Sequence, residues 1–363
     1  MTELRVKIRA RQGNFTLDVN TGIPLRGVSG IYGPSGCGKT SLLYSLAGLQ
    51  QLEPGSHITM DDTVWQSDSA NLPTFERQVG LVFQDARLFP HLNVRGNLEY
   101  AHRRAHRVQG PDLRQVCDWL ALEPLLARQV DELSRGQQQR VAIARTLLNH
   151  PRILLLDEPL ANIDISSRLD IMRHLHTISR ELDIPIVCVS HNMEELAALA
   201  NWLIVMQEGK IIAEGAMLEL CNQLELALAH EEQAAAIVSA KLVRQDDVYN
   251  LSELDFEGQD MFISSVDASP NATIRLRIPA RDISLCLQPP AHTSILNILQ
   301  ARIVEIEDSE NSRVLVRLQV GKQHLLARVT RKSIAHLELG VGTPVYAQIK
   351  SVALLSESRE LAS

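Results

Sequence analysis

Residues 33–40, GPSGCGKT, constrain the fold of this chain more than any other segment, because they match the pattern G-x-x-x-x-G-K-[ST]. They follow the apolar run VSGIY and precede TSLLYSLAGL, which has helical spacing. In such a strand–loop–helix unit, loop N–H groups and the helix N-terminus converge on phosphate oxygens. We therefore expect nucleotide binding by nine consecutive residues: Gly33, Pro34, Ser35, Gly36, Cys37, Gly38, Lys39, Thr40 and Ser41.

Two of these residues and two downstream acids have separate expected roles. Lys39 is expected to reach the β- and γ-phosphates, and the Thr40 hydroxyl to ligate Mg²⁺. The run RILLLDEP is a buried strand ending in Asp157 and Glu158, and adjacent acids there are costly unless a cation or a reaction uses them. Asp157 suits Mg²⁺, and Glu158 suits orienting or deprotonating the water that attacks the γ-phosphate. The alternative is a solvated strand end.

Two further polar side chains follow apolar strands. Gln84, in VFQDARLFP, can ligate Mg²⁺ and orient water, or it is an ordinary polar residue at a strand end. His191 follows IVCVS, and a histidine there is either structural or a sensor of the γ-phosphate. Asn192 and Glu195 predict a helix start directly after it, so that the chain turns at His191 and presents it to the site.

The stretch LSRGQQQR, residues 133–140, predicts a helix N-terminus. Ser134 and Gln137 fit the capping box S-x-x-Q, and capping alone would explain both residues. It does not explain Gly136, since glycine inside a helix costs about 1 kcal/mol relative to alanine. We interpret Gly136 as clearance for phosphate at a helix N-terminus that is itself an anion site.

The order of apolar runs along the chain predicts two architectures. Up to about residue 215, short apolar strands alternate with helical patterns, which indicates an α/β domain with a parallel sheet. We assign this domain to residues 1–234, with a helical insertion at about 90–135 and a helix at 216–234. Short alternating strands follow, predicting a β-rich linking region at 235–291 and a small all-β barrel at 292–358.

Composition excludes several classes of protein. The net charge of −7 argues against a general nucleic-acid binder, which would carry a basic surplus. The five cysteines are far apart and form no C-x-x-C, so a disulfide framework or a zinc site is not expected, and a reducing cytoplasm fits. The N-terminus lacks the apolar segment of a signal peptide, and no apolar run approaches the roughly 18 residues of a membrane helix.

Taken together, GPSGCGKT, Gln84, LSRGQ, ILLLDEP, LANID and His191 resemble the ATP-binding cassette (ABC) ATPases, and they occur in that family's order. The resemblance implies a head-to-tail homodimer with two ATP molecules at its interface. Ser134, Gly136 and Gln137 of one copy would then contact the γ-phosphate held by the other copy. Asp164 would lie in the loop that crosses this interface.

Two positions depart from the family's pattern. Arg135 stands where the usual signature, L-S-G-G-Q, has its first glycine, so it either adds charge to the composite site or points into solvent. The family also places an aromatic residue before the phosphate loop to stack on adenine. Phe15 is the nearest candidate, although its spacing looks short.

The C-terminal half resembles the accessory β-domain of molybdate-importer ATPases, and TSILNIL and VYAQIKS resemble the two ends of the Mop module, a small oxyanion-binding barrel. A tetrahedral dianion prefers several N–H and O–H donors to one strong cation. Thr293, Ser294, Lys350 and Ser351 match the module's ends and could bind an oxyanion. Alternatively, these residues merely close a structural or dimerising barrel.

The resemblance therefore implies an ATP- and Mg²⁺-dependent importer motor for molybdate, or for tungstate or sulfate, at the cytoplasmic face of the inner membrane. Its expected partners are a second copy of itself, two membrane-spanning permease subunits and, indirectly, an external molybdate-binding protein. Two other classes stay open. A soluble ABC ATPase of DNA repair or translation would usually show two cassettes, a coiled coil or zinc-type cysteines. A molybdate storage or sensing protein would not need Lys39, Glu158 and His191.

Overall fold

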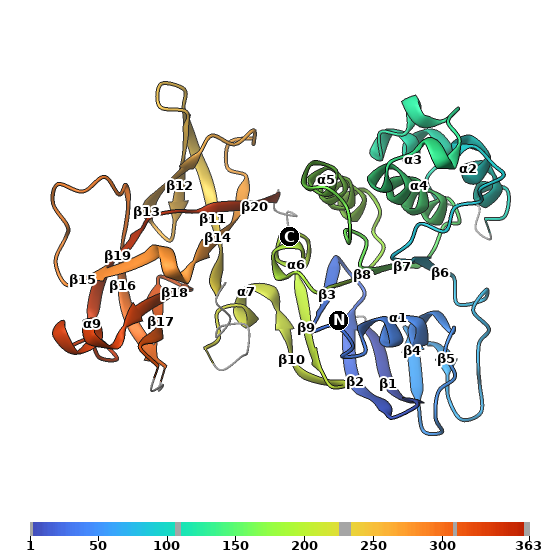
Figure 1. The fold of residues 1–363 in the computed structure, drawn as a ribbon, viewed down its shortest axis with the longest axis horizontal. Helices are drawn as coiled ribbons and strands as arrows, with labels where there is room; N and C mark the ends of the chain where they lie inside the picture. The colour runs from blue at the N-terminus through green and yellow to red at the C-terminus, as the bar shows by residue number, and fades with distance from the viewer. Residues whose placement is uncertain (1–2, 106–109, 225–233, 308–310, 359–363) are drawn as a thin grey trace. The chain divides into compact units, whose positions relative to one another are not determined.

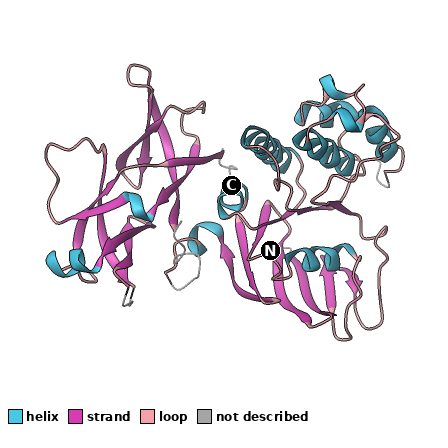
Figure 2. Cartoon of the chain, viewed as in Figure 1, coloured by secondary structure: helices cyan, strands magenta, loops and turns pink. Residues whose placement is uncertain are grey.

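The computed structural model of the chain describes residues 3–105, 110–224, 234–307 and 311–358. The chain divides into two compact units, Met1–Gly215 and Ala216–Ser363 (Figure 1). The first unit combines helices with two sheets, whereas strands make up most of the second (Figure 2). The α/β class predicted for the first part and the all-β class predicted for the second are both confirmed.

The first unit contains an antiparallel sheet of order β2-β1-β4-β5 and a second sheet of order β10-β9-β3-β8-β7-β6. Their strands are β1 Glu3–Gln12, β2 Phe15–Pro24, β3 Val28–Tyr32, β4 His57–Met60, β5 Thr63–Gln66, β6 Val79–Val82, β7 Ile153–Asp157, β8 Ile186–Ser190, β9 Trp202–Gln207 and β10 Lys210–Ala216. Both β7 and β8 are buried at every residue, as expected for central parallel strands.

The helices of the first unit are α1 Lys39–Ala47, α2 Val94–His102, α3 Leu113–Trp119, η1 Glu123–Leu125, η2 Val130–Glu132, α4 Arg135–Leu147, α5 Ile165–Glu181 and α6 Met193–Leu199. Between 90 and 135 the described chain is mostly helical, as predicted, and α2, α3 and α5 all pack on α4. A shared core lies between the two sheets and α1. It contains Leu4, Val6 and Ile8 from the alternating strand β1 and Leu42, Leu43 and Leu46 from α1.

The carboxyl ends of four parallel strands meet at one edge of the six-stranded sheet. In the register, Tyr32 lies opposite Ser190, Asp157 opposite Val189, and Val82 opposite Leu156. Ligands of open α/β sheets bind outside this edge. The segments after β3, β6, β7 and β8 are therefore the ones positioned to act together.

The second unit has two five-stranded sheets, of order β13-β12-β11-β14-β20 and β15-β19-β16-β17-β18. Its elements are α7 Met217–Leu220, β11 Ala235–Asp246, β12 Leu251–Phe256, β13 Gln259–Ser264, β14 Thr273–Pro279, η3 Ala280–Asp282, β15 Ile283–Cys286, β16 Asn297–Ile306, β17 Arg313–Val320, β18 Gln323–Thr330, α9 Arg331–His336, β19 Pro344–Ile349 and β20 Ala353–Ser358. The two edge strands β15 and β18 contact each other, so the second sheet curls toward a barrel.

The domain boundaries differ from the sequence-based ones in two respects. The first unit ends at Gly215 rather than at 234, because α7 and the residues after it belong with the second unit. There the Asn222 amide bonds the backbone of Ile237, and Leu224 packs against Leu315 and Leu326. Of the helix predicted at 216–234, only α7 is helical, and residues 225–233 lie outside the described part.

The predicted linking region and barrel also exchange strands. The strand β15 comes from the linking segment but pairs with β19, and β20 comes from the end of the predicted barrel but pairs with β14. One buried core runs through both sheets, from Ala236 to Ile349. Residues 235–291 and 292–358 are therefore not separate folding units.

Candidate functional site

The phosphate loop runs from the end of β3 into α1 and has the backbone that its glycines allow. Gly36 and Gly38 have φ values of 82° and 105°, in the left-handed region that favours glycine, and Gly38 is the N-cap of α1. Lys39 is buried, and its Nζ donates to the carbonyl oxygens of Gly33 at 2.8 Å and Pro34 at 3.0 Å. The loop thus surrounds the Lys39 ammonium group, which the sequence analysis predicts to bind phosphate.

Asp157, at the end of β7, lies against the first turn of α1. Its Oδ1 accepts a hydrogen bond from the Thr40 hydroxyl at 2.9 Å. Burial raises the pKa of this carboxyl above its ordinary value, and the Thr40 hydrogen bond only partly opposes that shift. A desolvated carboxylate beside a hydroxyl is an oxygen donor pair that fits Mg²⁺, which binds one or two carboxylates plus substrate phosphates. Sequence analysis missed Tyr44, whose hydroxyl also bonds Asp157.

Glu158 and His191 face each other at the ends of neighbouring strands. Glu158 Oε2 lies 3.2 Å from His191 Nδ1. The Glu158 backbone has φ 45°, an unusual value for a residue with a side chain, while its N–H donates to the Val189 carbonyl at 3.1 Å. Strain of this kind persists only where the surroundings fix it, and it is common at functional sites.

The turn after His191 differs in detail from the expected helix start. Asn192 is the N-cap of α6 and accepts from the Glu194 N–H at 2.9 Å. Glu195 does not complete a capping box. Instead, its Oε2 accepts from the buried Ser190 hydroxyl at 2.6 Å.

Two other predicted residues, Gln84 and Asp164, lie on segments that follow strands β6 and β7 of the six-stranded sheet. Gln84 is exposed and follows β6, whose last residue lies opposite Leu156 in the register. Asp164 is the N-cap of α5, and its carboxylate accepts from the Ser166 hydroxyl at 2.6 Å and the Ser167 N–H at 2.9 Å. These bonds hold the pKa of Asp164 at about 2.

The capping box predicted at the start of α4 is present. The Ser134 hydroxyl accepts from the Gln137 N–H at 3.3 Å, and the Gln137 side chain accepts from the Ser134 N–H at 3.0 Å. Ser134 and Arg135 are exposed, so this helix start is free to meet another molecule.

The structure gives Gly136 a role in packing within one chain, while its interpretation as clearance for phosphate stays a prediction. Gly136 is buried, and a Cβ added to it would lie 2.7 Å from the Cβ of Ser167 on α5. Real Cβ atoms do not approach so closely. The glycine is therefore already required by the packing of α4 on α5 within one chain.

Phe15, at the start of β2, lies against the phosphate loop. A Cβ added to Gly38 would meet its ring at 2.8 Å. Phe15 also lines a pocket of about 660 Å³ together with Pro34, Ser35, Gly36 and Cys37 of the loop. The structure thus brings the aromatic candidate and the phosphate loop to one cavity in spite of their spacing in the sequence.

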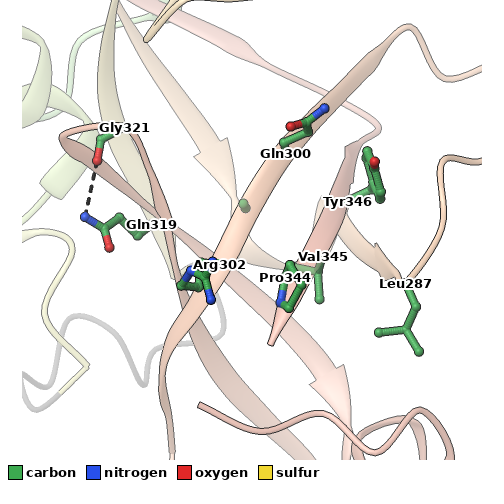
Figure 3. Close-up of a pocket in the computed structure, with 9 residues that line it drawn as sticks. Leu287, Gln300, Arg302, Gln319, Gly321, Pro344, Val345 and Tyr346 are labelled. Carbon is green, nitrogen blue, oxygen red and sulfur yellow. Dashed lines mark hydrogen bonds between the residues drawn. The ribbon is translucent and has the colours of Figure 1, made fainter. Parts of the chain in front are cut away.

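The four oxyanion candidates of the second unit lie near adjacent strand ends, since Asn297 of β16 pairs with Ile349 of β19. One of their hydroxyls already donates its proton within the chain, from Ser351 to the Asp282 carboxylate. The Thr293 hydroxyl accepts from the Ile295 N–H at 3.1 Å, a bond that does not use its own proton. The anionic Asp282 carboxylate at this position disfavours a dianion. None of the four candidates lines the groove of about 480 Å³ between β16, β17 and β19, which Arg302, Gln319 and Tyr346 border (Figure 3).

Sequence analysis also missed a buried arginine, Arg77, at the end of α1 away from the phosphate loop. Arg77 is 2% exposed, and its side chain donates to the carbonyls of Ser45 and Leu46 at the end of α1, both at 3.0 Å. It also donates to the Leu72 carbonyl at 2.9 Å. Arg77 lies in a polar segment without a motif, so nothing in the sequence singles it out.

Comparison with known proteins identifies the family of this chain. Residues 16–161 match the ABC transporter family, and residues 293–355 match the TOBE domain. The molybdenum import ATP-binding protein ModC of Aromatoleum aromaticum is 43% identical over 96% of this chain and 94% of its own length. That of Pseudomonas aeruginosa is 40% identical over 98% of this chain and 100% of its own length.

Solved structures show the same cassette fold. A dimeric post-hydrolysis state of the ATP-binding cassette MJ0796, bound to ADP and Pi, is 26% identical, covers 60% of this chain and 99% of that one, and has a TM-score of 0.50. CbiO1 of Clostridium perfringens, from the transporter complex cbiONQ, is 26% identical over 63% of this chain and 96% of its own, with a TM-score of 0.52. Within the described ranges, no helix has the length and apolar character to cross a bilayer.

Proposed function

This chain belongs to the family of molybdenum import ATP-binding proteins within the ABC transporters, and from that premise we propose that it is the ATP-hydrolysing subunit of a molybdate importer. One observation carries the proposal: the phosphate loop, the Thr40–Asp157 pair and the Glu158–His191 pair lie at one edge of one parallel sheet. That arrangement supplies phosphate binding, a metal-fitting donor pair and a general base together.

The chain's own residues divide the hydrolytic work. The phosphate loop holds the β- and γ-phosphates through its N–H groups and Lys39. Thr40 and Asp157 would hold Mg²⁺, which neutralises charge on the phosphate oxygens when bound. Glu158 accepts the proton of the attacking water, because it is close to the phosphate edge yet free of a guanidinium or ammonium partner among the described residues. His191 holds Glu158 in place and faces the γ-phosphate.

A second copy of the chain would complete each site. The exposed start of α4, with Ser134 and its capping box, presents N–H groups that suit the γ-phosphate of another copy. The dimeric state of the related cassette bound to ADP and Pi supports this assembly. ATP closes such a dimer only through contacts made in the closed state and lost on hydrolysis.

Membrane-spanning partners would carry the substrate itself. Their proposed docking region follows Gln84, where the ring of Phe89 packs at a tilt against the exposed Tyr100, with ring centroids 4.6 Å apart. We place the subunit at the cytoplasmic face of the membrane, bound to two permease subunits and served by an external molybdate-binding protein. Affinity purification from detergent-solubilised membranes tests this: a co-purifying permease subunit is expected, and a soluble or nucleic-acid partner alone would contradict it.

The transported anion is tested separately. Molybdate, tungstate and sulfate are nearly the same shape, so uptake of labelled molybdate is measured with each of the other two as competitor. We expect saturable, ATP-dependent molybdate uptake. Uptake of sulfate alone would leave the ATPase assignment intact and contradict the molybdate assignment.

The C-terminal unit is proposed to bind oxyanion or to dimerise. Oxyanion binding by Thr293, Ser294, Lys350 and Ser351 would require Asp282 to release the Ser351 hydroxyl. Calorimetric titration of the full chain with molybdate tests it. Binding that Lys350→Ala abolishes supports the oxyanion site, and absence of binding contradicts it.

A further inference from the structure

We propose that the ion pair between Arg168 and Glu195 is a positioning link that makes the turn holding His191 and the loop ending at Asp164 move together. The proposal rests on the proposed ATPase function and deepens it, because these two segments belong to different composite sites of the dimer. His191 serves the nucleotide bound by its own chain. Asp164 and the start of α4 serve the nucleotide bound by the other copy.

The first half of the link fixes the turn at His191. Ser190 is 3% exposed, and its hydroxyl accepts from the Asn192 N–H at 3.0 Å and donates to Glu195 at 2.6 Å. The Ser190 hydroxyl therefore connects the residue before His191 to the residue after it. Glu195 on α6 is the anchor of that hydroxyl.

The second half of the link comes from α5. Arg168 Nη1 lies 3.4 Å from Glu195 Oε1, and Arg168 Nη2 donates to the Ile163 carbonyl at 3.3 Å. Ile163 directly precedes Asp164, the N-cap of α5. One guanidinium thus joins the carboxylate below His191 to the backbone of the loop that leads to Asp164.

Burial makes the two charges of the pair costly to separate. The Glu195 side chain is 11% exposed and that of Arg168 is 32% exposed. A carboxylate removed from water to this extent is costly without a cation, and removing one partner of such a pair leaves an uncompensated charge. A displacement of α6 is therefore expected to draw α5 with it rather than to break the pair.

The same turn of α5 also reaches the signature helix. Ser167, next to Arg168, is the residue whose Cβ occupies the space left by Gly136 of α4. The first turn of α5 consequently touches the two segments offered to the other copy and, through Glu195, the turn that faces the chain's own nucleotide. Coupling of two sites requires a physical element that both sites bias, and this turn fits that description.

The test measures ATP hydrolysis by the assembled transporter against ATP concentration. The variants are Arg168→Gln, Glu195→Gln and the double substitution. Arg173→Gln is the matched control, because Arg173 lies on the same helix in an exposed pair with Asp170. Nucleotide affinity of the isolated chain and its melting temperature are measured in parallel.

We expect the wild type to be cooperative, with a Hill coefficient between about 1 and 2 for two sites. Each single variant and the double variant are expected to lower the coefficient toward 1 and kcat by about 3- to 30-fold, with nucleotide affinity unchanged. The double variant should lose no more than either single variant, since both remove the same link. The control should match the wild type.

A cooperative enzyme whose Hill coefficient survives Arg168→Gln overturns the proposal, as does a non-cooperative wild type or additive losses in the double variant. If Arg168→Gln lowers the melting temperature too far, Arg168→Lys replaces it. Lysine keeps the charge toward Glu195 but not the fork that reaches Ile163, so it should lower cooperativity without unfolding; unchanged cooperativity would again overturn the proposal. Since the readout is ATP hydrolysis, a wrong transport substrate would leave the test valid.

Discussion

At the residue scale, the site depends on groups whose placement does not stabilise the nucleotide-free protein. Asp157 is buried with a raised pKa, and Glu158 has a left-handed backbone. Both are explained if phosphate chemistry uses them, and neither stabilises the nucleotide-free protein. Functional sites commonly hold such unfavourable features.

Asp157→Asn is expected to stabilise the nucleotide-free protein at neutral pH. The carboxyl has a pKa above its ordinary 3.8 in the folded chain, so its ionised form is disfavoured there. This penalty is absent below the ordinary pKa and is fully developed above the raised one. Denaturant unfolding of variant and wild type should therefore show a gain that is larger at pH 7 than at pH 4, together with loss of Mg²⁺-dependent hydrolysis. A gain that does not depend on pH would contradict the burial argument.

Gly136→Ala is expected to lower ATPase activity by about 10- to 100-fold, because the new Cβ displaces the start of α4 from Ser167. Ser167→Gly in the same chain removes the clashing atom and should restore most of the activity. Steady-state ATPase assays of both single variants and the double variant check this. If Ser167→Gly restores nothing, the glycine is required by phosphate or by the other copy and not by α5.

At the element scale, the position of α1 is set from both ends. Its N-terminus begins at the phosphate loop, and its last carbonyls are held by Arg77. The four last carbonyls of a helix lack partners within it, so a buried helix end needs such donors. Arg77 thus supports the phosphate loop from the far end of the helix.

Arg77→Gln is expected to lower the free energy of unfolding by about 2–4 kcal/mol, since it removes the guanidinium that donates to the Leu46 and Leu72 carbonyls. Arg9→Gln is the control, because Arg9 on β1 lies in exposed pairs with Asp18 at 3.9 Å and Glu53 at 3.8 Å. Urea unfolding of the two variants measures the difference. Equal stability of the two variants would mean that water satisfies the end of α1.

The motifs at the strand ends could be predicted because each is local: a strand, a turn and a few polar residues in sequence order. The capping box of Ser134 is local too. The contact between Gly136 and Ser167 and the pair between Arg168 and Glu195 could not be predicted, because each depends on how two helices pack. The strands after residue 290 were found by their alternation, but their partners depend on long-range register.

At the scale of the whole molecule, one buried core runs through both sheets of the second unit, and these sheets exchange strands. The edge strands β15 and β20 each pair with a strand from the other side of residue 291. The boundary that sequence analysis places after residue 291 therefore does not separate two independent parts of the fold.

The exchange predicts how fragments behave. A fragment of residues 216–363 is expected to unfold cooperatively, because it keeps both sheets and their shared core. A fragment of 292–358 lacks β15 and leaves β20 without β14, so it should show no cooperative transition. Thermal unfolding followed by circular dichroism separates the two, and a cooperative transition in the shorter fragment would contradict the exchange.

The central claim is that this chain drives molybdate import by hydrolysing ATP, and transport into right-side-out, ATP-loaded vesicles containing the complete transporter tests it most directly. With the wild-type chain we predict ATP-dependent accumulation of labelled molybdate. With Glu158→Gln we predict that the chain still binds ATP, while turnover and accumulation fall by about 100-fold or more, because the general base is gone. Accumulation at the wild-type rate with Glu158→Gln would contradict the account.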